Sequence, residues 1–105
     1  MPCRGDSLRI TQKEIDQLYP QIPDWDILSE NGVNYLYKTF KFKNFSAAVK
    51  FVNKVSDTAE KEGHHPKLIL EWGKVQVLWW THKIKGLHRN DFVMAAKTDS
   101  IGNLT

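Results

Sequence analysis

The chain has 105 residues, of which 41% are hydrophobic and 26% are charged, and its formal net charge at pH 7 is +3. This size and composition predict one globular domain that spans residues 1–105 around a single core. No apolar run approaches the ~20 residues that a membrane-spanning helix needs, and the N-terminus lacks the apolar stretch of a secretory signal. We therefore expect no membrane segment and a cytoplasmic protein. The lone Cys3 cannot form an internal disulfide, and we assign it no function.

The first predicted element is a short helix that follows a dispensable start up to Leu8. Thr11 and Glu14 have the spacing of a capping box, in which each side chain bonds the backbone N–H of the other residue. Pro20 and Pro23 are expected to end this helix, because proline lacks the N–H that a helix interior requires.

Residues 24–43 are predicted to form two strands. The turn between them contains Asn31-Gly32, a dipeptide typical of tight hairpin turns. In the second strand apolar side chains alternate with polar ones, so one face is apolar apart from Lys38 and the other is exposed to water. The apolar residues of this face are Leu36, Phe40 and Phe42. This apolar face requires a cover.

The predicted cover is the longest helix, which runs from Phe45 to about Glu62 with Asn44 as its N-cap. Gly63 stands where helices commonly end in a left-handed residue, and Pro66 keeps the residue before it out of helical geometry. His64 and His65 therefore leave the helix in an extended conformation. Glu60, one helical turn before His64, is expected to orient or charge its imidazole.

Residues 67–83 are predicted to form a second hairpin with a two-residue loop at Trp72-Gly73. This loop would pair Glu71 with Lys74 and, counting outward, Leu70 with Val75, Leu68 with Val77 and His65 with Trp80. Because side chains alternate along a strand, we expect Leu68, Leu70, Val75, Val77 and Trp79 to share the core face. Trp80 and His82 would share the other face with His65. Three histidines thus converge at one end of the hairpin.

A last helix is predicted from about Arg89 to Thr98, with Asp91 in its first turn, where a carboxylate suits the helix dipole. His88 stands in the N-cap position, and a polar tail is expected from about Asp99. The elements thus follow the order α-β-β-α-β-β-α.

This order, together with "EKEGHHP", "WWTHK" and "GLHRNDFVMAAK", resembles the pterin-4a-carbinolamine dehydratases. The resemblance implies an α+β fold with a four-stranded antiparallel sheet covered by helices on one face, and assembly as homodimers or homotetramers. It implies dehydration of the 4a-hydroxytetrahydrobiopterin that aromatic amino-acid hydroxylases release. The residues that match the family's functional positions are His64, His65 and His82 as catalytic histidines, Glu60 and Asp91 as supporting carboxylates, and Trp25 as a tryptophan beside the pterin. Gly63 departs from the family, whose members often have an acidic or amide residue there.

Histidines suit this chemistry because the reaction delivers a proton to the departing hydroxyl and removes one from a ring nitrogen. An unperturbed imidazole, with a pKa of about 6.5, can act in either direction near neutral pH. No cofactor is required. We also expect no metal site, because the side chains of His64 and His65 diverge along an extended segment and no nearby cysteine completes a ligand set. The sequence leaves open which histidine is the acid, although we prefer His64 as base and His82 as acid.

Each candidate also has a purely structural interpretation. A His-His-Pro segment after a helix is more often an exposed loop than a site, and Trp25 is as well suited to core packing as to ligand contact. Asp91 could be only a helix cap, and Glu60 only a solvated side chain. Two alternatives to an enzyme also stay open: a non-catalytic interaction or assembly protein on the same fold, and a nucleic-acid-binding module. The net charge of +3 permits an acidic partner, but a nucleic-acid binder would need a continuous basic face.

Overall fold

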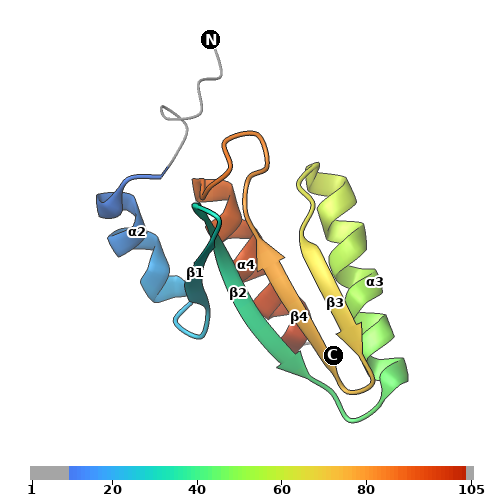
Figure 1. Ribbon diagram of the computed structural model, residues 1–105. Coiled ribbons are helices and arrows are strands. Elements are labelled where there is room, and N and C mark those ends of the chain that lie inside the picture. Colours follow the sequence, from blue (N-terminus) through green and yellow to red (C-terminus); the bar gives the residue numbers. More distant parts are fainter. Residues whose placement is uncertain (1–9, 104–105) are drawn as a thin grey trace.

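The structure is a computed structural model that describes residues 10–103. Cys3 and the segment up to Leu8 lie outside the described residues. The described chain contains four strands and three α-helices (Figure 1). The strands are β1 (Asp26–Glu30), β2 (Val33–Lys41), β3 (Lys67–Glu71) and β4 (Lys74–Trp79), and the helices are α2 (Gln12–Leu18), α3 (Phe45–Glu62) and α4 (Arg89–Asn103). A short 3₁₀ helix, Tyr19–Gln21, follows α2.

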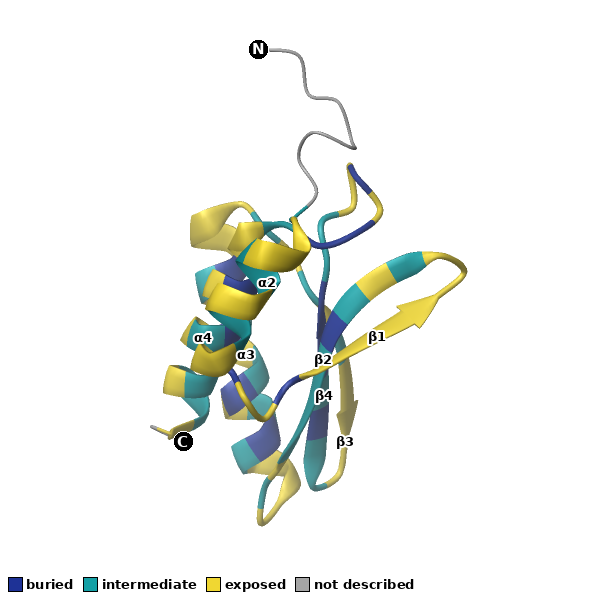
Figure 2. Cartoon of the chain, turned by 90° about the vertical axis from the view of Figure 1, so that its left-hand side faces the viewer, coloured by how far each residue is buried: buried dark blue, intermediate teal, exposed yellow. Residues whose placement is uncertain are grey.

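The four strands form one antiparallel sheet in the order β1-β2-β4-β3. All three helices lie on the same side of this sheet, and no helix of the described residues covers its other side (Figure 2). The predicted α+β architecture is therefore confirmed. No helix among residues 10–103 is long and apolar enough to cross a membrane.

Short-range sequence signals form the first three elements as predicted. The side chains of Thr11 and Glu14 complete the capping box of α2. The turn between β1 and β2 has positive φ angles at both Asn31 and Gly32, 54° and 80°. Positive φ at both central residues is the signature of the tight turn that matches the twist of a hairpin, and asparagine and glycine tolerate it best.

Helix α3 also begins and ends at the predicted residues. The Asn44 side chain accepts a hydrogen bond from the N–H of Ala47, and Gly63 adopts the left-handed conformation with φ of 66°. The N–H of His64 donates to the carbonyl of Ala59, which satisfies one of the last free carbonyls of the helix. Beyond this contact the chain turns away from the helix axis, and the two histidines follow outside the helix.

The second hairpin has the predicted register from Glu71↔Lys74 to Lys67↔Leu78. The predicted pairing of His65 with Trp80 is wrong, because β3 begins only at Lys67. Proline at position 66 has no N–H to offer a strand ladder, which explains why the pairing stops there. Leu70, expected in the core, is 36% exposed, since β3 is an edge strand.

Helix α4 continues to Asn103, so the predicted end at Thr98 and the polar tail from Asp99 are wrong. The extra turn is held by tertiary contacts that its composition does not reveal. Asp99 accepts hydrogen bonds from the side chains of Trp25 and Lys38, and Gly102 lies so close to the Phe40 ring that a Cβ there would be 2.9 Å from it.

The core lies between the sheet and the helices. It is built from side chains of the inner faces of β2 and β4 and the facing sides of α3 and α4, among them Leu36, Phe51, Val55, Val75, Val77, Trp79, Phe92 and Ala95. Trp79, at the end of β4, is the core residue next to the end of α3, where its ring stacks on His64. The two predicted histidine segments meet at this edge of the core.

Candidate active site

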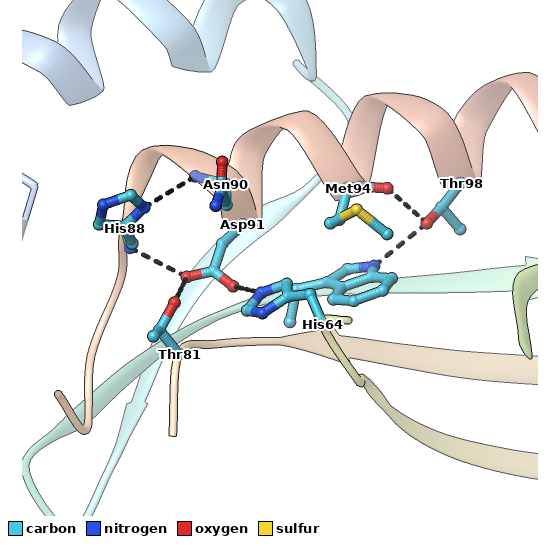
Figure 3. A network of polar contacts seen from close by, with 8 residues as sticks. His64, Thr81, His88, Asn90, Asp91, Met94 and Thr98 are labelled. Atoms are coloured by element: carbon cyan, nitrogen blue, oxygen red, sulfur yellow. Dashed lines mark hydrogen bonds and ion pairs between the residues drawn. The ribbon is translucent and has the colours of Figure 1, made fainter. Parts of the chain in front are cut away.

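His64 is held by a buried carboxylate on another helix. Its Nε2 atom lies 2.6 Å from Oδ1 of Asp91, which stands in the first turn of α4 (Figure 3). The Asp91 side chain has no exposed surface, whereas the His64 side chain keeps 17% of its surface exposed. The imidazole thus has one nitrogen inside the protein and an edge that reaches solvent.

Asp91 receives two further hydrogen bonds on its other oxygen. Its Oδ2 atom accepts from the hydroxyl of Thr81 and from the backbone N–H of His88, each at 2.9 Å. A carboxylate group only accepts hydrogen bonds, so its contact with His64 requires an N–H on the imidazole nitrogen that faces it. We therefore assign the Nε2 proton to His64, which leaves its Nδ1 atom as the acceptor of the neutral ring.

The carboxylate partner of His64 differs from the prediction. Glu60, expected beside His64, instead lies 3.0 Å from Nε2 of His65. The left-handed Gly63 turns the chain at the end of α3, and the extended segment after it sends successive side chains in opposite directions. His64 consequently points toward α4, while His65 points back to the last turn of α3. Both members of the Glu60–His65 pair are largely exposed, at 76% and 60%.

Two consecutive tryptophans each stack on one histidine. The ring of Trp79 lies 5.4 Å from that of His64, with 14° between the planes. The ring of Trp80 lies 4.6 Å from that of His82, with 3° between the planes. Neighbouring residues of a strand point to opposite faces of the sheet, so the two indoles flank the end of β4 from both sides.

The three histidines predicted from the sequence surround one pocket of about 460 Å³. Its lining residues are Gly63, His64, His65, Thr81, His82 and Lys83. The structure therefore brings His64, His65 and His82 together and places Glu60 and Asp91 in contact with two of them. The catalytic function of these residues stays a prediction.

The structure does not bring Trp25 to the histidine pocket. Its side chain is fully buried, its indole N–H donates to Asp99 at 3.0 Å, and its ring meets Phe40 edge to face. The residue precedes β1, near the C-terminal half of α4, whereas the histidines lie at the start of α4. Trp25 is thus a core residue, and its place beside a ligand stays a prediction.

Sequence reasoning missed the parts played by Thr81 and by the two tryptophans. Thr81 reaches Asp91 because it lies between Trp80 and His82, and side-chain alternation turns it to the inner side. The same alternation would have predicted the inward direction of the Thr81 side chain, if Asp91 had been assigned to the inner side of the sheet. His88 behaves as predicted: its Nδ1 atom accepts from the N–H of Asn90, which makes it a helix cap.

No group of three or more histidine, cysteine, aspartate or glutamate side chains within residues 10–103 is arranged to hold a metal ion. The Nε2 atom of His64 already bonds Asp91, and the Nε2 atom of His65 bonds Glu60. The nitrogens of the two neighbouring histidines therefore have different carboxylate partners.

The fold and the pocket define an α+β protein with a histidine and carboxylate site suited to proton transfer. Residues 8–101 match the family model described as pterin 4 alpha carbinolamine dehydratase. The chain belongs to this family. A relative from Saccharophagus degradans, named "Putative pterin-4-alpha-carbinolamine dehydratase", is 58% identical over 99 residues, which cover 94% of this chain and 88% of the relative. A relative of the same name from Nitrosococcus oceani is 52% identical over the same shares of the two chains.

Two solved structures share the fold. A structure from Brucella melitensis, described as a transcriptional coactivator/pterin dehydratase, superposes with a TM-score of 0.80 at 31% identity and covers 90% of this chain and 98% of its own. Another, described as a pterin dehydratase-like protein and RuBisCO assembly factor of the alpha-carboxysome, has a TM-score of 0.64 at 18% identity and covers 75% and 89%. At that identity the second likeness concerns the fold alone.

Proposed function

We propose that the protein dehydrates 4a-hydroxytetrahydrobiopterin, or a closely related 4a-hydroxytetrahydropterin, to the quinonoid dihydropterin. Membership of the family supports the reaction class. The observation that carries the proposal is the pocket in which His64, backed by buried Asp91, faces the same space as His82. A volume of about 460 Å³ is within the range of small-molecule sites, roughly 300–1,000 Å³.

In this proposal the reaction consists of two proton transfers and one bond cleavage. The C4a–O bond breaks as the hydroxyl takes a proton from a general acid and leaves as water. The N5–H proton passes to a general base, and the electron pair left on N5 forms the C4a=N5 double bond. The reaction transfers no electrons to or from another molecule, so acid–base catalysis suffices. We therefore expect no dependence on a metal or redox cofactor.

His64 is the proposed general base. The Asp91 carboxylate accepts a hydrogen bond from the Nε2–H group. The Nδ1 atom, which keeps a free lone pair, can therefore accept the N5 proton. The same carboxylate stabilises the imidazolium that forms. This arrangement corresponds to the aspartate–histidine pairs in which the carboxylate fixes the tautomer and the imidazole moves the proton.

His82 is the proposed general acid. Its exposed side chain lines the same pocket as His64, and its ring stacks on the face of Trp80, which attracts a positively charged group. Acid and base must act at different atoms of the substrate, and histidines from two different segments satisfy this requirement. His65, paired with Glu60, is proposed to hold the polar edge of the substrate beside them.

The direct test measures dehydration of a 4a-hydroxytetrahydropterin by the purified protein against the uncatalysed rate. We expect a rate that is proportional to protein concentration and unchanged after chelator treatment. A rate equal to the uncatalysed one would refute the proposed function. Activity lost on chelation and restored by zinc would instead refute the acid–base mechanism.

A non-catalytic interaction protein is the competing interpretation, and the description of one structural neighbour as an assembly factor belongs to that class. Such a function does not require two histidines oriented by a buried carboxylate and two indoles. The dehydration assay separates the two interpretations.

We also propose that the protein forms homodimers or homotetramers, as its family resemblance implies. Light scattering at micromolar concentration should give a multiple of the monomer mass, and a monomer would contradict this proposal.

A further inference from the structure

Trp80 is a large aromatic residue on the side of the sheet that no helix covers. Its ring lies parallel to that of His82, 4.6 Å away, and meets the ring of Tyr35 on β2 edge to face at 6.3 Å. Trp80 also lines a shallow pocket of about 260 Å³ on this open side, together with Tyr35, Leu78 and Lys67. A single aromatic row thus leads from β2 to the histidine pocket.

The two proposed proton carriers are held to different degrees. The His64 ring is fixed twice, by the hydrogen bond to Asp91 and by the stack on Trp79. The indole N–H of Trp79 donates to Thr98, whose hydroxyl donates in turn to the carbonyl of Met94, so that this support is itself anchored in α4.

The His82 ring has a single support. Among the contacts of residues 10–103, its ring has the Trp80 stack and no hydrogen bond or ion pair to a carboxylate. Lys83 and the other two histidines line the same pocket, and none of them bonds the ring. His82 lies beyond the end of β4 and is exposed. Without such a stack its side chain would be free to change rotamers.

We propose that Trp80 is the positioning residue of His82. The flat indole restricts the imidazole to a plane parallel to its own, and the edge contact with Tyr35 supports the indole in turn. This inference rests on the proposed function for its catalytic consequence, although the orienting contact itself is independent of any activity. It also explains why a bulky indole occupies a sheet face open to solvent, where a smaller β-forming residue would serve the fold equally well.

The first experiment measures the contact without reference to catalysis. Ring protons that lie over the face of an indole are shifted upfield in the NMR spectrum. We expect Trp80→Leu to move the His82 ring signals downfield, toward the position of an exposed histidine, with no comparable change at His65. Trp80→Phe keeps an aromatic face and should retain part of the shift. Trp72→Leu is the matched control, because Trp72 is 69% exposed in the turn at the opposite end of the hairpin.

The second experiment measures the catalytic consequence in the same variants. We expect Trp80→Leu to lower kcat about three- to tenfold with little change in KM, because orientation of the acid acts on the chemical step rather than on binding. Trp80→Phe should recover most of the rate, and Trp72→Leu should equal the unaltered protein. Circular dichroism establishes that each variant is folded.

The outcomes separate the two proposals. Unshifted His82 signals in both Trp80 variants would overturn the positioning inference whatever the activity. Shifted signals with unchanged kcat would overturn its catalytic part. If the unaltered protein shows no dehydration at all, the proposed function fails, and the NMR comparison still decides whether Trp80 orients His82.

Discussion

The imidazole of His64, just past the end of α3, and the carboxylate of Asp91, in the first turn of α4, lie 2.6 Å apart although 27 positions separate them in the chain. This contact joins the two longest helices at the edge of the core. It gives a histidine that reaches solvent a buried carboxylate partner, and a carboxylate that accepts from Nε2 leaves Nδ1 as the nitrogen that can accept a proton.

Replacing Asp91 by asparagine should separate orientation from mere packing. The amide keeps the size of the side chain and one acceptor for Thr81 and the N–H of His88, but it presents an NH₂ group to Nε2 of His64. The imidazole proton would then move to Nδ1 and block the base. We expect kcat/KM for dehydration to fall at least about tenfold in a folded protein. Asp57→Asn, an exposed change on α3, is the control, and equal rates in the two variants would contradict the assignment of His64 as base.

Removal of either proposed proton carrier should reduce turnover strongly. His64→Ala and His82→Ala are each expected to lower kcat at least about tenfold and to leave the fold intact, since positioned acid–base groups contribute ~10²–10⁴-fold. His88→Ala is the matched histidine control: its ring caps α4, whereas the backbone N–H that bonds Asp91 remains. Steady-state kinetics of the three variants test this. Near-normal rates in both pocket variants would remove the histidines from the mechanism.

Gly63 should tolerate asparagine better than alanine. Nothing lies within 4 Å of a Cβ built at this residue, so the penalty comes from its φ of 66° alone. We expect Gly63→Ala to lower the free energy of unfolding by about 1 kcal/mol and Gly63→Asn to lower it by less, because asparagine adopts the left-handed conformation more readily. Urea denaturation measures both values. Equal stability of the alanine variant and the unaltered protein would show that α3 ends differently in solution.

Glu14 should contribute to stability only above acidic pH. A hydrogen bond from the Arg89 side chain, followed by one from the backbone N–H of Thr11, lowers the pKa of its carboxyl group below the usual 4.5. Because the folded-state pKa is the lower one, this contribution is complete above the unfolded-state pKa and is lost as the pH falls through the folded-state value. Glu14→Gln keeps the capping box and removes the charge.

The measurement for this pair compares the urea midpoints of the two proteins at pH 7 and near pH 2. The unaltered protein should be slightly more stable at pH 7, by a small amount because the Arg89 side chain is 64% exposed, and the difference should vanish at the acidic pH. High salt should also reduce it. A difference that persists at low pH would mean that Glu14 acts through packing rather than charge.

The sequence by itself determined the features that depend on a few neighbouring residues. The capping box at Thr11, the turn at Asn31-Gly32, the end of α3 at Gly63 and the register of the second hairpin are each set by local backbone preferences. The same preferences take His64 and His65 out of the helix toward the end of the hairpin. The element order, and with it the resemblance to the family, could therefore be predicted.

Only the tertiary structure decided which side chains from distant segments meet. Asp91 rather than Glu60 bonds His64, Trp25 lies in the core against Asp99, and α4 extends past Asp99 because Lys38 and Phe40 of β2 stabilise its last turn. Such pairings depend on how the helices dock on the twisted sheet, and that docking is set by the packing of the whole core rather than by local spacing. A spacing of one helical turn favoured Glu60 as the partner of His64, whereas the turn at Gly63 and the position of α4 gave that histidine a buried aspartate instead.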